Sequence, residues 1–497
     1  MKKSKNKYFF YVITLLTFVQ ILLDGSLINI ACALMVFSST ALTFYYIMYR
    51  GVFQKYPLPC WAIISFNFST QSGALIFQSL FFTSLITLLE EPLATFFYLA
   101  VFNSLLVLSL YIFVSSPKLN SYSTIIRNKI IFRLDVFKYP SVRQLWIMGI
   151  LAILAFFYKS LSGNTIEYGD VGGKFIEGFI PFLSAPYLLL VSRFYKISLI
   201  NKQLLYLYTF IIIVMGAASN SRTTIFIGLA NAGLFYIFLL LSGRIKPPNI
   251  TLVRAISLAS IIFVLAPAMT NLATAMLVAR LDRQTSTLSE TITNTVDALL
   301  DTNKLKEYRD FITSSILTDY SEKYIDNEVL SRFITTKFTD ITLSTESIYL
   351  PVNQEITRSF ILNKIISVLP SPLLPNSFDK NEVLFISFGD TVFLADSGRI
   401  IAGMKTGSNV GSLVSMGLVS FLFLIPFFVI FIIIFHSLEF VDNNSGFIVA
   451  TPFCFLIYPI YLMFCGDSIA EPVMYIIRVV PQTLVVYFLV FIISRKL

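Results

Sequence analysis

The chain alternates between long apolar runs and short polar stretches, as a protein does when it crosses a membrane several times. A helix needs about 20 apolar residues to span the hydrocarbon core of a bilayer. Runs of roughly this length cover residues 8–24, 27–49, 60–88, 93–115, 144–160, 178–195, 203–219, 223–242, 252–279, 410–436, 446–465 and 473–493. The pattern therefore predicts an all-α polytopic membrane protein with about 12 transmembrane helices.

One long polar segment, Leu281 to Asn409, interrupts this pattern. It holds 17 of the 28 acidic residues but only 12 of the 37 basic ones, a net charge of −5 against +14 for the rest. Basic loops stay on the cytoplasmic side of a membrane, so we expect this segment to face outward and both termini to be cytoplasmic. The chain then divides into nine spans (1–280), a large outer loop (281–409) and three more spans (410–497).

Parts of the polar segment have a helical pattern. Thr287 and Glu290 are spaced as in a capping box, and apolar residues follow on one helical face. A second amphipathic stretch, 356–368, stops before Pro370. The end of the segment is rich in glycine. We therefore expect a partly helical cap resting on the membrane face.

Composition excludes several classes of function. Hydrophobic residues make up 56% of the chain and charged residues 13%. The net charge of +9 does not indicate a nucleic-acid partner, because the basic residues flank apolar spans, where membrane topology requires them. The four cysteines lie in or beside predicted spans, and the only histidine, His436, falls at the cytoplasmic end of one. No metal site, disulfide framework or cofactor is expected.

Two arginines are the first candidates for chemistry. Arg222 follows Ser221 in a tight turn between the seventh and eighth spans, on the outer side. Arg478 lies within the last span, about 8 Å from its outer end at the rise of an α-helix. A guanidinium group suits bidentate contact with phosphate. The alternatives are an Arg222 that reaches lipid headgroups and an Arg478 that only pairs with Asp467 or Glu471.

Other charged residues at the outer surface extend this set. Arg280 and Arg283 leave the ninth span, and Arg399 lies in the glycine-rich return to the tenth. An outer carboxylate in a desolvated pocket is able to accept a proton from a sugar hydroxyl, although each alone is more simply a surface charge. The candidates are Glu382, Asp390, Asp396, Asp467 and Glu471, with the loop tyrosines Tyr308, Tyr320, Tyr324 and Tyr349 as contacts for a sugar.

These features together resemble the O-antigen polymerase (Wzy) family. The resemblance covers the whole chain in outline: a dozen spans, one dominant loop in the second half, and the Ser221–Arg222 turn between two central spans. Loops of that family carry an arginine followed, after ten residues, by a glycine. Arg222 and Gly233 have this spacing, whereas Arg399 and Gly411 miss it by one residue.

The resemblance implies a GT-C-like, metal-independent glycosyltransferase of the bacterial inner membrane. It would join undecaprenyl-diphosphate-linked repeat units into O-antigen or capsular polysaccharide at the periplasmic face. Arg222, Arg399 and Asp396 would be catalytic, and Arg222, Arg280 and Arg478 would bind the diphosphate. The partners would be the lipid-linked glycan donor and acceptor, membrane lipid and a chain-length regulator protein.

Three other functions stay open. A lipid-linked oligosaccharide flippase or other transporter also needs a cationic cavity and many spans, but it does not need a large loop on one side, and no internal repeat is visible. An O-antigen ligase would, by its own family resemblance, require a histidine on the outer side, and this chain has none there. A non-catalytic assembly scaffold would tolerate substitution of the outer arginines.

Overall fold

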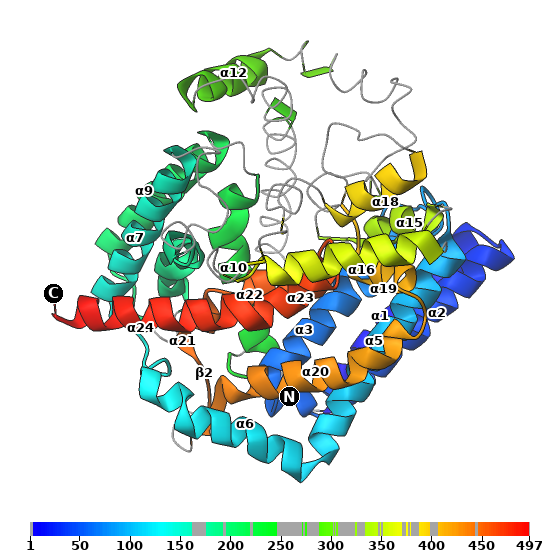
Figure 1. Ribbon diagram of the computed structural model, residues 1–497, viewed down its shortest axis with the longest axis horizontal. Coiled ribbons are helices and arrows are strands. Elements are labelled where there is room, and N and C mark those ends of the chain that lie inside the picture. Colours follow the sequence, from blue (N-terminus) through cyan, green and yellow to red (C-terminus); the bar gives the residue numbers. More distant parts are fainter. Residues whose placement is uncertain are drawn as a thin grey trace.

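The computed structural model describes residues 3–161, 175–191, 195–218, 222–245, 288–301, 333–345, 351–369, 387–397, 406–442 and 446–496, together with a few isolated residues between 271 and 378. Nearly all regular structure in these ranges is helical (Figure 1). Strands in them are limited to one antiparallel hairpin, β1 (Glu439–Asp442) and β2 (Gly446–Val449).

The N-terminal helices follow the predicted spans closely. The second span continues at its end as a π-helical turn, η1. α2 packs against both α1 and α5. The bounds of these elements are α1 (Lys3–Leu23), α2 (Leu27–Phe44), η1 (Tyr45–Tyr49) and α5 (Pro92–Ser115).

The middle of the chain adds one surface helix and a second group of apolar helices. The predicted span at 178–195 is shorter than expected, because its regular part is the 3-10 helix η6. Pro186 lies inside η6 and has no backbone N–H with which to continue the hydrogen bonds of an α-helix. The bounds are η2 (Val52–Gln54), α6 (Pro117–Lys129), η4 (Ile131–Leu134), α7 (Val142–Leu161), η6 (Ile180–Leu190), α9 (Leu199–Ala218) and α10 (Arg222–Leu241). The predicted span at 252–279 lies almost wholly outside the described residues.

The polar segment and the C-terminal part consist mostly of short helices. The two helices predicted within the polar segment are confirmed as α12 and α16. The segment contains α12 (Leu288–Leu300), α15 (Thr336–Ser344), α16 (Pro351–Ile366) and α18 (Phe388–Ser397). After it come α19 (Asn409–Ser415), α20 (Ser420–Ser437), the hairpin, α21 (Thr451–Cys454), α22 (Ile457–Leu462), η10 (Met463–Cys465), α23 (Ala470–Met474), η11 (Tyr475–Val479) and α24 (Val480–Lys496).

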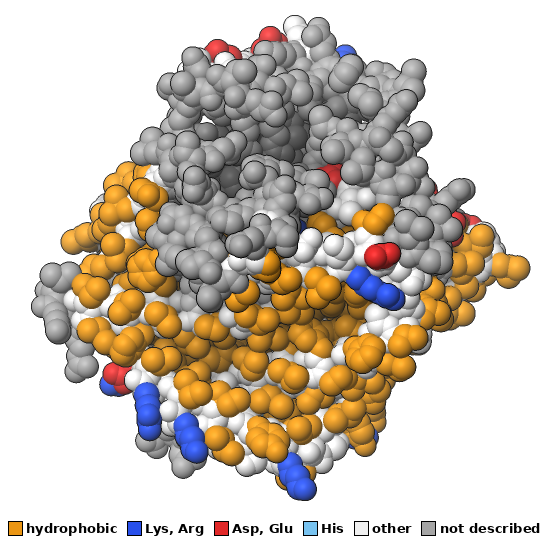
Figure 2. All heavy atoms as spheres, in the orientation of Figure 1, with side chains coloured by type: hydrophobic (Ala, Val, Ile, Leu, Met, Phe, Trp, Pro, Cys, Tyr) orange, Lys and Arg blue, Asp and Glu red, His pale blue; other side chains and the backbone are white. Residues whose placement is uncertain are grey.

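Five helical stretches among the described residues are long and apolar enough to cross a membrane. They are Leu27–Tyr49, Pro92–Ser115, Leu199–Gly216, Ser420–Ser437 and Ala470–Ser494, with four shorter apolar helices beside them. Figure 2 shows hydrophobic side chains as a broad belt across one face, with Lys and Arg side chains along its lower edge. The chain thus has the make-up of an all-α membrane protein.

The third predicted span, 60–88, is neither uniform nor as long as expected. It consists of α3 (Pro57–Asn67), the π-helical turn η3 (Phe68–Ser72) and α4 (Gly73–Leu80). Turns replace the helix from Phe81 onward. Within η3 the polar residues Ser69, Thr70, Gln71 and Ser72 are all buried, so this part of the helix faces protein and not lipid.

The prediction of a single span at 446–465 is wrong. β2 takes up its start, and the remainder is divided among α21, α22 and η10. Pro452 and Pro459 lie in this stretch and limit helix length. Most of its residues are buried inside the protein. The apolar run therefore reflects the protein core, which an apolar stretch of this length is equally able to form.

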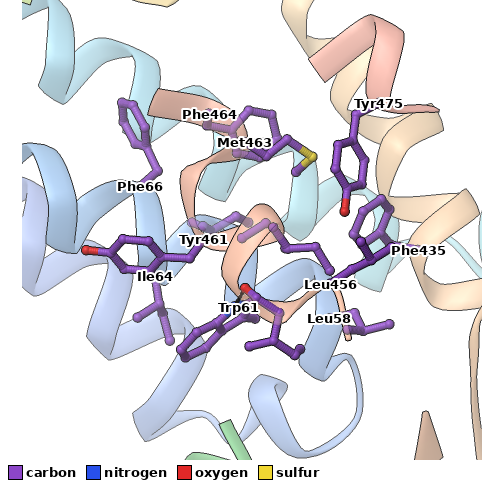
Figure 3. Packing of buried hydrophobic residues seen from close by; sticks show 14 of the residues in the cluster. Leu58, Trp61, Ile64, Phe66, Phe435, Leu456, Tyr461, Met463, Phe464 and Tyr475 are labelled. Carbon is purple, nitrogen blue, oxygen red and sulfur yellow. Dashed lines mark hydrogen bonds between the residues drawn. The ribbon is translucent and has the colours of Figure 1, made fainter. Parts of the chain in front are cut away.

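Aromatic side chains from α3 and from the α22–η10 stretch meet in this core. Figure 3 shows Trp61, Phe66, Tyr461 and Phe464 gathered there. The indole N–H of Trp61 donates to the carbonyl oxygen of Ile457 at 3.1 Å. This hydrogen bond joins two segments about 400 residues apart in the chain.

The two tryptophans provide a matched test of that core. Trp61→Phe removes the only indole donor to the buried carbonyl of Ile457, and we expect a loss of about 1–3 kcal/mol in the free energy of unfolding. Trp146→Phe, whose half-buried indole donates to Asn201 at 3.2 Å, is the control and should cost less. Thermal unfolding in detergent measures both, and equal effects would contradict this account of the core.

Candidate functional site

The polar segment enters the helical body at the π-helical turn η3. The backbone N–H of Thr335 donates to the carbonyl oxygen of Ser69 at 2.8 Å, and the Thr336 hydroxyl donates to the carbonyl oxygen of Thr70 at 2.8 Å. A π-helical turn shifts the hydrogen-bond pattern of a helix, so carbonyl groups become available to outside donors. The residues that begin α15 supply these donors.

A buried ion pair fixes α15 beside the start of α5. Lys337 Nζ lies 2.8 Å from Asp340 Oδ2 and 3.4 Å from Glu90 Oε1, and the side chains of Lys337 and Asp340 are only 5% and 0% exposed. The Asp340 carboxylate also accepts from the backbone N–H groups of Glu90 and Glu91 at 2.8–3.0 Å. It therefore satisfies donors at the N-terminus of α5 that the helix itself leaves unpaired.

Asp467, three residues before the last long apolar stretch, is hydrogen-bonded to two parts of the polar segment. Its Oδ2 accepts from the backbone N–H of Phe388 at 2.6 Å, at the start of α18. Its Oδ1 accepts from the N–H groups of Gly407 at 2.7 Å and Gly389 at 3.4 Å. Burial raises the pKa of Asp467 above its ordinary value, although these hydrogen bonds and nearby Lys364 act in the opposite direction.

Glu471 lies four residues further on, in α23, close enough to Asp467 for the two carboxylates to interact electrostatically, and we call them the carboxylate pair. A Cβ atom at Gly466 would overlap the Glu471 carboxylate, so this glycine leaves the space that the carboxylate occupies. Asp467, Gly466 and Glu471 are all partly exposed. The pair is thus accessible from outside as well as closely surrounded by protein.

Lys364 and two phenylalanines complete this site from α16 and α18. α16 packs against α18, α19 and α23. Lys364 Nζ lies 5.3 Å from the ring centroid of Phe360, whose ring lies 5.8 Å from that of Phe388. Among the described residues, Lys364 is the one cation that interacts with the two carboxylates, which gives this part of the site a net negative charge when both are ionised. A site of this kind favours taking up a proton from a neutral ligand.

A small cavity lies next to the pair. It is lined mainly by hydroxyl, amide and aromatic side chains, among them Thr335, Ser408, Asn409 and Cys465, while Asp467 and Glu471 lie outside this lining. Cys465 and Ser69 share a hydrogen bond of 2.8 Å. Asn409 Oδ1 is buried and has no hydrogen-bond partner in the described part of the chain. The lining therefore suits a neutral polar group.

Arg478 is paired with a carboxylate that the sequence did not indicate. Its Nη2 lies 3.1 Å from Oε2 of Glu177, and the two side chains are 28% and 34% exposed. Asp467 and Glu471, the partners considered from the sequence, do not take this role. Arg478 lies in the π-helical turn η11, within the last long apolar stretch.

The side chains of most other predicted site residues lie outside the described part of the chain. Arg222 is the first residue of α10 and Asp396 belongs to α18, but the description covers only their backbone. The remaining ones lie outside the described residues: Arg280, Arg283, Arg399, Glu382, Tyr308, Tyr320 and Tyr349.

Two other candidates have structural roles. The backbone N–H of Asp390 donates to Ser387 Oγ at 2.9 Å, and the Asp390 carboxylate accepts from the N–H of Ser387 at 3.5 Å, which is the reciprocal pattern of a capping box at the start of α18. Tyr324 is fully buried and donates to the carbonyl oxygen of Leu85 at 2.8 Å. It is therefore not an exposed platform for a sugar.

Sequence reasoning did not select Lys364 or Lys337. Both lie in helices of the polar segment, where a lysine is normally solvated, and no local signal separates them from their neighbours. Gly407 belongs to the glycine-rich end of the polar segment, and its N–H approaches the candidate carboxylate of Asp467.

Comparison with known proteins adds no relative: no family model matches the chain, and neither curated proteins nor solved structures match it.

The Lys337–Asp340 pair should determine whether the polar segment docks. Asp340→Ala leaves the buried Lys337 ammonium with Glu90 as its remaining carboxylate partner among the described residues, and we expect a loss of about 3–5 kcal/mol of stability. The double change Lys337→Met and Asp340→Leu removes both charges and should cost less, because it leaves only the N–H groups of Glu90 and Glu91 without their acceptor and no unpaired buried charge. Thermal unfolding and limited proteolysis compare the two variants, and a double variant as unstable as Asp340→Ala would count against the ion pair.

The raised pKa of the half-buried Asp467 should be visible in the pH dependence of stability. The pKa of Asp467 in the folded protein lies above its ordinary value of 3.8, so its contribution to stability is fully present below that pH and is lost as the pH rises through the folded pKa. Asp467→Asn removes this titration. We expect the wild type to lose stability relative to this variant as the pH rises from 3.8. If the stability curves of the wild type and Asp467→Asn stay parallel in unfolding titrations, the pKa of Asp467 is not raised in the folded protein.

Proposed function

We propose that the chain is a polymerase that joins undecaprenyl-diphosphate-linked repeat units into O-antigen or capsular polysaccharide at the periplasmic face of the bacterial inner membrane. The observation that carries the proposal is the partly exposed carboxylate pair Asp467–Glu471, next to Lys364 and beneath helices of the polar segment. A lipid-linked substrate and a water-soluble sugar chain have to meet at such a boundary.

The reaction needs a base, a way to stabilise the leaving group and no cofactor. A hydroxyl of the acceptor sugar attacks the anomeric carbon of the donor and forms the new glycosidic bond. The bond from that carbon to the diphosphate oxygen breaks, and the lipid diphosphate leaves with the electron pair. The hydroxyl proton passes to a carboxylate, for which Glu471 is the better placed because the oxygens of Asp467 already accept three backbone hydrogen bonds.

Arginines account for the leaving group in this proposal. Arg478 lies at the last span and is partly exposed, so it is able to exchange Glu177 for a diphosphate oxygen. Arg222 and Arg280 are proposed to bind the same diphosphate, and Arg399 and Asp396 to act at the reacting centre. Guanidinium groups stabilise the charge that grows as the glycosidic bond breaks.

A transporter of lipid-linked oligosaccharide is the second candidate, and the broken helix α3–η3–α4 favours it. Interrupted helices with buried polar residues are common at substrate sites of transporters. The side chain of Asn67, just before η3, is fully buried, and neither its oxygen nor its nitrogen has a hydrogen-bond partner among the described residues.

Surface polysaccharide from complemented deletion cells tests the proposal. We expect deletion to reduce a long ladder on a gel to lipid core with one repeat unit, and the wild type to restore the ladder. Glu471→Gln should fail to restore it, since loss of a general base lowers a rate by about 10²–10⁴. Arg222→Ala should also fail, because the leaving diphosphate loses a cation that stabilises its growing charge. The matched controls Glu355→Gln and Arg358→Ala change exposed residues of α16 and should restore it.

The same gel separates the rival functions. Loss of every repeat unit on deletion, including the first, would assign the chain to transport or ligation. If the Glu471→Gln variant and the Arg222→Ala variant each restore a full ladder at the wild-type protein level, neither residue has the role proposed for it, and the proposal fails.

A further inference from the structure

The surface helix α6 has two sharply different sides. At 3.6 residues per turn, Asn120, Ser123 and Arg127 fall on one side and Lys118, Tyr122, Ile125 and Lys129 on the opposite side. The first set faces the protein. The second set is exposed, with Tyr122 at 57% and Ile125 at 45%.

The inward side is held by polar contacts to two other elements. Arg127 Nη2 donates to the carbonyl oxygen of His436 at 2.9 Å and lies 3.3 Å from its Nε2. Asn120 donates to the hydroxyl of Tyr56 at 3.2 Å. His436 Nδ1 lies 3.1 Å from Glu439, which also accepts from the N–H of Leu58 at the start of α3. These contacts fix the rotation of α6 and therefore the direction in which its other side points.

The outward side combines apolar and basic groups without any acid. Two apolar residues, Tyr122 and Ile125, lie between Lys118 and Lys129 along one line. The sequence contains no Asp or Glu between Glu91 and Asp135. Figure 1 places α6 along the lower edge of the molecule, where Figure 2 shows Lys and Arg side chains below the hydrophobic belt.

We propose that this side of α6 binds the anionic headgroup surface of the adjacent membrane leaflet. Tyr122 and Ile125 enter the boundary with the acyl chains, and Lys118 and Lys129 extend from either side to lipid phosphates. Charge complementarity selects this occupant, because a basic side without acids matches an anionic lipid surface and repels a second copy of itself. The inference concerns the leaflet opposite the polar segment and does not depend on the proposed reaction.

Retained lipid measures the headgroup preference directly. The purified full chain is reconstituted in bilayers of equimolar phosphatidylcholine and phosphatidylglycerol, extracted into mild detergent, and its retained lipids are quantified. We expect enrichment of phosphatidylglycerol in the wild type, with each lysine contributing about fivefold. Lys118→Gln with Lys129→Gln should lose it, and Lys118→Arg with Lys129→Arg should keep it.

Two further controls make the assignment specific. Lys196→Gln with Lys202→Gln removes the same charge from exposed sites near the start of α9 and should leave the enrichment unchanged. Tyr122→Trp should give additional fluorescence that lipids with brominated acyl chains quench. Size-exclusion and thermal unfolding check that each variant is folded.

Four results would overturn the inference. The first two are phosphatidylglycerol enrichment that survives in the Lys118/Lys129 glutamine variant and an equal loss of enrichment in the Lys196/Lys202 variant. The third is an absence of quenching for the Trp introduced at position 122. The fourth is a change of oligomeric state in the Lys118/Lys129 glutamine variant while its retained lipid stays unchanged. The last would assign this side of α6 to contact between copies. All are measured without glycan substrate, so the outcome is separate from that of the polymerase test.

Discussion

The hydrogen bonds between η3 and the start of α15 are the constraint on which the rest of the structure depends. Carbonyl groups released by a π-helical turn need donors, because there is no water inside a helical bundle to satisfy them. Ser69 and Thr70 find these donors in Thr335 and Thr336 of the polar segment. The helical body and this part of the polar segment are therefore complementary, and neither is complete alone.

Glycines allow the close approach that this docking requires. A Cβ at Gly73 in α4 would overlap Ile334, just before α15, and a Cβ at Gly411 in α19 would overlap Thr342 within it. Both glycines have helical backbone, so space and not backbone conformation accounts for them. The same reasoning holds for Gly466 beside Glu471. Docking of α15 and placement of the Glu471 carboxylate thus both depend on glycines that leave space for a neighbouring side chain.

The sequence was sufficient for the apolar helices and insufficient for the way the polar segment meets them. Spans such as 27–49 and 93–115 were predictable almost to the residue, because lipid-facing helices need long uninterrupted apolar runs. The run at 446–465 misled because core and lipid select the same residue types. Asp467 and Glu471 could be shortlisted as outer carboxylates, but Lys364 and the N–H donors of Phe388 and Gly407 come from distant segments that only tertiary structure brings together.

Charged side chains are paired within the protein on the side of the polar segment, whereas two lysines extend outward on the side of α6. On the side of the polar segment, Lys337 and Asp340 are paired inside the protein and Asp467 is surrounded by backbone donors, so the protein itself supplies each partner. On the side of α6, Arg127 is held inward, whereas Lys118 and Lys129 extend outward with no acid near them in sequence. Charges fixed within protein keep a defined geometry, which a site for chemistry requires. Exposed bases on flexible stems instead suit a fluid partner such as a lipid surface, where position matters less than sign.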